Sequence, residues 1–235
     1  MTNSNSNKPS IVLVHGAFSD GSSWKKIIPI FIEEGFTVIA VQNPLKSLAE
    51  DVATTKRVIE AQKGDVVLVG HSYGGSVITD AAAGSDKVKA LVYVAAFAPE
   101  AGESVGALLG KFPATALGTA LAPDSAGFLY IDRSKFHGVF AEDVPEGEAA
   151  IMAATQKPIN GAAFGEPTGF AAWKTIPSWY VVTTQDHAVN PELQRFMAKR
   201  IGAQTVEVKA SHVPFLSQPA EVAKVIKAAI AQIQK

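Results

Sequence analysis

A serine between glycines is the residue of this 235-residue chain with the clearest potential for chemistry. Ser72 lies in the run Gly70-His71-Ser72-Tyr73-Gly74, which directly follows the apolar run Val66–Val69 and directly precedes a stretch typical of a helix. On such a tight strand-to-helix turn the serine is strained, and side chains two residues before or after it would collide with the neighbouring strand and helix. The helix directs its N-terminal N–H groups at the reacting centre. The spacing therefore predicts that Ser72 is a nucleophile.

A serine hydroxyl needs a base that takes its proton and an acid that orients this base. His212 follows the last predicted strand, and Asp186 follows the strand before it. Both loops open at the edge of the sheet where Ser72 lies, so the three side chains can meet there. Their order along the chain, Ser72, Asp186, His212, differs from the orders in the two common types of serine protease. We therefore predict these three residues to be catalytic.

The end of the first predicted strand carries a His-Gly-Ala-Phe sequence that can complete such a site. An oxyanion hole needs two N–H donors directed at the oxygen on which negative charge develops. We expect one donor from Tyr73, the residue after the nucleophile. The other is expected from Ala17, with Phe18 as the alternative. His15 is predicted to link loops through hydrogen bonds, and His71 is predicted to point away from the site.

Composition argues against several classes of protein. The chain is 47% hydrophobic and 18% charged with a net charge of −1, which supports a large core and gives no reason to expect nucleic acid or an anionic membrane as a partner. It has no cysteine, which excludes disulfides, a thiolate nucleophile and cysteine-ligated metal. No apolar run approaches the roughly 20 residues that span a bilayer. Residues 1–9 show no apolar signal segment. A soluble, cytoplasmic protein is predicted.

Short apolar runs alternate with amphipathic segments, the pattern of a parallel sheet with helices on both faces. The predicted strands are Ser10–Val14, Thr37–Val41, Val66–Val69, Val88–Val94, Ser178–Thr183 and Thr205–Val208. The predicted helices are Ser23–Glu34, Leu48–Gln62, Tyr73–Ala83, Pro191–Ile201 and Pro219–Ile233. The sequence thus predicts an α/β fold with a mainly parallel sheet of about six strands.

Residues 97–173 interrupt this alternation. They are rich in Pro and Gly and hold no strand run of useful length, so we expect an inserted, mostly helical cap over the serine. The predicted organisation is a disordered tail (1–9), a core (10–96 and 174–235) and this cap (97–173). The many aromatic residues of the cap argue against a loose surface loop.

The substrate pocket is expected between the serine and the cap, and its aromatic lining favours an apolar acyl or alcohol group. The residues predicted to line it are Phe18, Trp24, Phe97, Phe136 and Phe140. Three cap carboxylates are instead expected to be solvated: Asp124, Asp132 and Asp143.

Taken together, these motifs resemble α/β-hydrolase fold proteins, and among them the bacterial carboxylesterase-like relatives of plant methylesterases and hydroxynitrile lyases. The resembling blocks are Val12–Trp24, Val66–Gly75, Val88–Pro99, Ile176–Pro191 and Ser211–Pro219. The resemblance implies the α/β-hydrolase fold, with Ser72, Asp186 and His212 as the triad and Ala17 and Tyr73 as oxyanion donors.

Two departures from the family pattern argue against a cyanohydrin lyase. The lyases carry a Lys directly after the catalytic His and a Thr directly after the first His. Val213 and Gly16 stand at these positions.

The predicted activity is that of a serine hydrolase that cleaves a small, largely apolar carboxylic ester through an acyl-enzyme. No metal or organic cofactor is required, and the expected partner is a small-molecule ester. Three other activities with the same triad remain alternatives: a lactonase, a cofactor-free perhydrolase and a carbon–carbon bond hydrolase. The sequence does not separate them, because they differ in pocket shape and water placement. A ligand-binding protein that kept the fold and lost turnover is the alternative of a different class.

Overall fold

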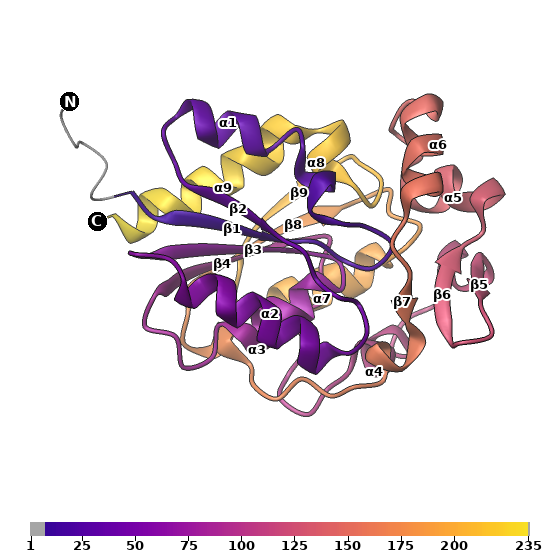
Figure 1. The fold of residues 1–235 in the computed structure, drawn as a ribbon, viewed down its shortest axis with the longest axis horizontal. Helices are drawn as coiled ribbons and strands as arrows, with labels where there is room; N and C mark the ends of the chain where they lie inside the picture. The colour runs from indigo at the N-terminus through magenta and orange to yellow at the C-terminus, as the bar shows by residue number, and fades with distance from the viewer. Residues whose placement is uncertain (1–7, 235) are drawn as a thin grey trace.

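The fold is built around one parallel β-sheet, in a computed structural model that describes residues 8–234. Its six strands lie in the order β2-β1-β3-β4-β8-β9, and all neighbouring strands are parallel (Figure 1). They are β1 (Ser10–Val14), β2 (Val38–Val41), β3 (Val66–His71), β4 (Val88–Val94), β8 (Ser178–Thr183) and β9 (Gln204–Val208). The predicted six-stranded sheet is confirmed. The predicted disordered tail lies outside the described residues, except for Lys8 and Pro9.

The order of the strands determines where a site can form. β1 and β3 are buried along their whole length, as expected for central strands with helices on both faces, whereas β9 at the edge is mostly exposed. The chain leaves β1 for β2 on one side and leaves β3 for β4 on the other. At such a reversal a crevice opens outside the carboxyl ends of the strands. Ala17 and Ser72 follow these two strand ends.

Helices cover both faces of the sheet. α1 (Ile28–Glu33) and α9 (Pro219–Ile233) lie on one face, and α2 (Leu48–Glu60), α3 (Gly74–Ala81) and α7 (Pro191–Arg200) lie on the other (Figure 1). Ser47 and Asn190 cap α2 and α7 by accepting hydrogen bonds from backbone N–H groups. The predicted helix Ser23–Glu34 is instead a 3-10 turn, Gly21–Trp24, followed by α1. Pro29 in the first turn of α1 has no N–H with which to continue an earlier helix.

The segment between β4 and β8 lies over the carboxyl ends of the strands (Figure 1). Its helices are α4 (Val105–Leu109), α5 (Arg133–Phe140) and α6 (Glu146–Thr155), with 3-10 turns at Ala116–Thr119, Gly161–Phe164 and Ala172–Lys174. Three short strands, β5 (Leu121–Pro123), β6 (Phe128–Ile131) and β7 (Ile159–Asn160), form an antiparallel sheet. The boundaries of the cap at residues 97 and 173 stay a prediction.

Besides its helices the cap holds short strands that the sequence does not reveal. Its strands are two to four residues long, too short for an alternating pattern to stand out in the sequence. A polar turn joins β5 to β6: Asp124 accepts hydrogen bonds from the N–H groups of Ala126 and Phe128, and Gly127 takes a φ of 82°.

Polar contacts join the cap to the core. Glu166 accepts a hydrogen bond from the N–H of Leu48 at the start of α2, at 2.8 Å. Glu148 on α6 forms ion pairs with Lys25 and Lys26, at 2.8 and 3.3 Å. Between residues 8 and 234 no helix combines the length and the apolar character that a membrane span requires.

Candidate active site

Ser72 lies directly after β3 in the left-handed region of the backbone, with a φ of 53°. A Cβ on Gly70 would lie 2.7 Å from the carbonyl oxygen of Gly74, and one on Gly74 would lie 2.6 Å from that of Val14. Both contacts are shorter than real Cβ atoms make, so the turn requires glycine on either side. Such a backbone conformation costs a non-glycine residue about 1–3 kcal/mol. The strained turn that the sequence predicts is present.

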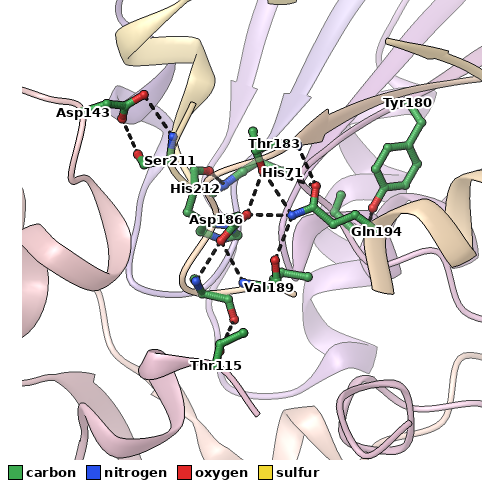
Figure 2. Close-up of polar contacts among 12 residues, drawn as sticks. His71, Thr115, Asp143, Tyr180, Thr183, Asp186, Val189, Gln194, Ser211 and His212 are labelled. Carbon is green, nitrogen blue, oxygen red and sulfur yellow. Dashed lines mark hydrogen bonds and ion pairs between the residues drawn. The ribbon is translucent and has the colours of Figure 1, made fainter. Parts of the chain in front are cut away.

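Asp186 and His212 form a buried pair. Asp186 follows β8, and His212 lies between β9 and the short helix α8 (Pro214–Ser217). The Nδ1–H of His212 donates to Oδ2 of Asp186 at 2.7 Å, with both residues at most 3% exposed (Figure 2). This bond places the proton on Nδ1, so Nε2 carries the lone pair and can act as a base.

Five donors hold the carboxylate of Asp186. The N–H groups of Ala188 and Val189 donate to Oδ1, each at 2.8 Å. On Oδ2 the hydroxyl of Thr183 and the amide of Gln194 join His212, again at 2.8 Å each (Figure 2). Gln194, fully buried on α7, also donates to the carbonyl of Val189 and accepts from the N–H of Thr183. Sequence reasoning missed Thr183 and Gln194, although both stand within eight residues of the predicted acid.

His71 lies behind His212 rather than on the reacting side. Its Nε2–H donates to the backbone carbonyl of His212 at 2.8 Å, and the two rings lie 4.6 Å apart. Burial keeps the pKa of His71 well below its ordinary value, with a smaller effect from the neighbouring His212, so the ring is neutral. His71 therefore supports the loop of the predicted base.

Asp143 of the cap is solvated, as expected, and also contacts the core. Asp143 is exposed, but its carboxylate accepts hydrogen bonds from the N–H and the hydroxyl of Ser211, the first at 3.0 Å (Figure 2). Because Ser211 precedes His212, this contact joins the cap to the loop that carries the predicted base. The exposure of Asp143 agrees with the expectation of a solvated residue, and the contact with Ser211 arises because the fold brings the segment after α5 beside this loop.

A cavity of about 190 Å³ lies between the core and the cap, and both Ser72 and His212 line it. Of the aromatic residues predicted on its wall, Phe18, Phe97 and Phe140 lie there. Trp24 and Phe136 do not: they are fully buried, and Phe136 packs behind Phe140 with ring centroids 5.1 Å apart. Composition reveals aromatic residues near a site but not which of them face it.

The expected oxyanion donors are the backbone N–H groups of Ala17 and Tyr73. Ala17 lines the cavity, and Tyr73 directly precedes α3. Among residues 8–234 these two N–H groups donate to no other group. An N–H at a helix N-terminus, together with one from a neighbouring loop, can stabilise an oxyanion.

His15 does not line the cavity. It is fully buried, its Nδ1–H donates to the carbonyl of Gly16 at 2.8 Å, and its Nε2 accepts from the N–H of Asn43 at 3.0 Å. Burial lowers its pKa to about 4, so the ring is neutral. The predicted role of His15 in linking loops is confirmed. No group of three or more His, Asp or Glu side chains within the described part of the chain is placed to hold a metal ion.

Comparison with known proteins agrees with this fold. The profile of the Alpha/beta hydrolase family matches residues 11–225. The Alpha/beta hydrolase nvfD of Aspergillus novofumigatus is 30% identical, over 94% of this chain and 96% of its own length. Methylesterase 8 of Arabidopsis thaliana is 25% identical, over 90% and 86%. The pyrethroid hydrolase of Sphingobium faniae JZ-2 has a similar fold, with a TM-score of 0.82 at 24% identity, over 95% and 97%.

Proposed function

From the premise that the chain belongs to the alpha/beta hydrolase family and is a hydrolase, we propose that it is a serine esterase for small, largely apolar carboxylic esters. The observation that carries this proposal is the buried Asp186–His212 pair, which opens on the same cavity as the strained Ser72. Ester hydrolysis is also the chemistry that the name of Methylesterase 8 describes.

The reaction proceeds in two steps. His212 Nε2 takes the proton of Ser72 while Oγ bonds to the ester carbonyl carbon, and the N–H groups of Ala17 and Tyr73 stabilise the oxyanion. The bond to the alcohol oxygen then breaks, and the alcohol leaves with the proton from His212. Water, deprotonated by His212, attacks the acyl-enzyme and releases the acid and free Ser72. Asp186 keeps the imidazole in the required tautomer and stabilises its protonated form.

The cavity wall supports an apolar substrate. Within residues 8–234, no charged side chain lines it. Apart from Ser72 and His212, its polar side chains already bond to backbone: Thr115 donates to the carbonyl of Ala188 at 2.9 Å, and Asn190 donates to that of Pro113 at 3.1 Å. A charged group inside would therefore lose its hydration without gaining a partner.

The size of the cavity supports an ester whose acyl or alcohol group is about as large as a benzene ring. An apolar cavity of about 150 Å³ is known to bind benzene. At about 190 Å³ this cavity accommodates a substituted ring or a chain of similar volume.

The test combines turnover with covalent labelling. The purified protein should hydrolyse p-nitrophenyl esters, be labelled on Ser72 by a fluorophosphonate, and prefer a butyrate to the equally long but charged monosuccinate. Ser72→Ala should lower kcat by about 10⁴-fold or more while circular dichroism stays unchanged. Retention of more than about a tenth of wild-type turnover by this variant would contradict the role of Ser72. Ester binding without turnover or labelling would instead identify a ligand-binding protein.

A further inference from the structure

Residues 43–45, which follow β2 and precede α2, are linked by hydrogen bonds to both proposed oxyanion donors: through His15 to the loop of Ala17, and through Asp51 to the side chain of Tyr73. Asn43 and Leu45 are fully buried, and Leu45 has a φ of 59°, a conformation that a branched side chain rarely adopts. We call residues 43–45 the β2–α2 segment. Its buried polar contacts form two chains of hydrogen bonds, one to the peptide of Ala17 and one to Tyr73.

The first chain of hydrogen bonds leads to Ala17. The N–H of Asn43 donates to Nε2 of His15, which leaves the proton on Nδ1, and this Nδ1–H donates to the carbonyl of Gly16. That carbonyl and the N–H of Ala17 belong to one planar trans peptide, so they point in opposite directions. When the carbonyl is held towards His15, the N–H is held in the opposite direction.

The second chain of hydrogen bonds leads to Tyr73. The N–H of Leu45 donates to Oδ1 of Asp51 at 2.8 Å, and the hydroxyl of Tyr73 donates to Oδ2 at 2.9 Å. Asp51 and Tyr73 are both fully buried. The side chain of Tyr73 is therefore held in place, and the backbone N–H of the same residue lies next to the nucleophile in the chain.

We propose that the β2–α2 segment, through His15 and Asp51, positions both N–H donors of the oxyanion hole. His15 and Asp51 are positioning residues, because neither lines the cavity. This inference rests on the proposed esterase function. The cap also bonds to the segment: the ammonium of Lys157 donates to the carbonyl of Asn43, and the N–H of Asn160 donates to that of Leu45 at 2.9 Å.

The buried carboxyl group distinguishes positioning from simple packing. Burial raises the pKa of Asp51 to about 6, so its charge costs stability at neutral pH. Buried ionic groups are often replaceable by neutral groups without loss of stability. A role in packing alone predicts that an isosteric neutral residue leaves turnover unchanged, whereas a positioning role predicts a loss of kcat.

The experiment compares Tyr73→Phe and Asp51→Asn with Tyr93→Phe. Tyr93 is a matched control, because it is fully buried and its hydroxyl bonds to Thr79 at 2.9 Å, away from the cavity. We expect the first two variants to lower kcat about 10- to 100-fold with KM nearly unchanged, since misplacement of a donor costs less than its removal. The double variant should lose little more, because both changes act on the same contact between Asp51 and Tyr73. Tyr93→Phe should keep wild-type kcat.

A second readout reports on the oxyanion directly. A trifluoromethyl ketone adds to the serine as a tetrahedral oxyanion, so its inhibition constant should rise in parallel with the loss of kcat/KM. If both variants keep wild-type kcat and inhibitor affinity while wild-type Ser72 is labelled by a fluorophosphonate, the positioning role is refuted and the esterase stands. If wild-type Ser72 is neither labelled nor active on any ester, the proposed function fails and this inference fails with it.

Discussion

Replacing Asp186 by Asn probes the centre of the site with a minimal change of shape. Oδ1 of the carboxylate accepts two backbone N–H groups, and Oδ2 accepts from Thr183, Gln194 and His212. An amide keeps one oxygen and places an NH₂ group, a donor, where the other oxygen was. In either orientation the new donor therefore meets donors of the protein.

The two orientations differ in cost. An NH₂ group in the place of Oδ1 faces the N–H groups of Ala188 and Val189, and neither can turn away. In the place of Oδ2 it faces the amide of Gln194, while the Thr183 hydroxyl can rotate and His212 can accept at Nδ1. One buried donor without an acceptor costs roughly 1–3 kcal/mol, so the second orientation is preferred by about that amount. It moves the imidazole proton to Nε2, where the ring can no longer take the proton of the nucleophile.

Asp186→Asn should therefore change two measurements independently. The free energy of unfolding should fall by roughly 1–3 kcal/mol, which lowers Tm by about 2–12 °C in a protein of this size. In p-nitrophenyl acetate hydrolysis kcat should fall by roughly 10³- to 10⁴-fold. Asp124→Asn is the matched control, because Asp124 also accepts two backbone N–H groups but is exposed and lies outside the cavity. A folded Asp186→Asn protein with kcat within tenfold of wild type would refute the assignment of the acid.

Two further predictions follow from the cavity wall and from the buried carboxyl group. Phe140→Ala enlarges the cavity and should shift the preferred ester by one or more methylenes, a change of about 10- to 200-fold in kcat/KM across a chain-length series. Phe136→Ala should instead mainly lower the free energy of unfolding, by about 3–5 kcal/mol. Equal rank orders of substrates in wild type and Phe140→Ala would contradict the first expectation. The pKa of Asp51 is raised from 3.8 to about 6, so the native state binds its proton more tightly than the unfolded chain, and the contribution of this group to stability is lost as pH rises from about 4 through 6. The free energies of unfolding of Asp51→Asn and wild type, measured by urea titration, should therefore diverge by about 3 kcal/mol in favour of the variant between pH 4 and 7. Both proteins contain the other titratable groups around this carboxyl, Tyr73, Lys157 and Glu50. A difference that stays constant with pH would rule this out.

The sequence alone located the loops of the site but not the contacts between them. The elbow around Ser72 depends on local spacing, and the order of strands and helices places the loops of Asp186 and His212 at the same edge of the sheet. The sequence does not indicate the role of Gln194, because a polar residue on an amphipathic helix is normally predicted to be solvated. Only the packing of α7 against β8 turns its amide towards Asp186.

The cap is the part of the fold that was least predictable. Its strands of two to four residues form because neighbouring segments supply partners, as Asp124 and Gly127 do for the turn between β5 and β6. β5 and β6 pair locally around this turn, but β7 reaches β6 from a distant part of the chain, with Asn160 opposite Phe128, so no short window of the sequence contains that pairing. The same holds for Phe136 and Phe140, which lie one helical turn apart on α5 and differ only in which of them faces the cavity.

The cap also contacts the peptides that hold the predicted acid, so its contacts reach the proposed catalytic groups as well as the substrate pocket. The hydroxyl of Thr115 donates to the carbonyl of Ala188 (Figure 2). The N–H of Leu117 donates to the carbonyl of His187 at 3.2 Å. Each of these carbonyls shares a planar peptide with an N–H that donates to Asp186. The cap therefore fixes, from the opposite side, the two N–H groups on Oδ1. A change at residues 115–117 should consequently act on the orientation of the acid and on kcat, whereas a change at Phe140 should act on which ester fits.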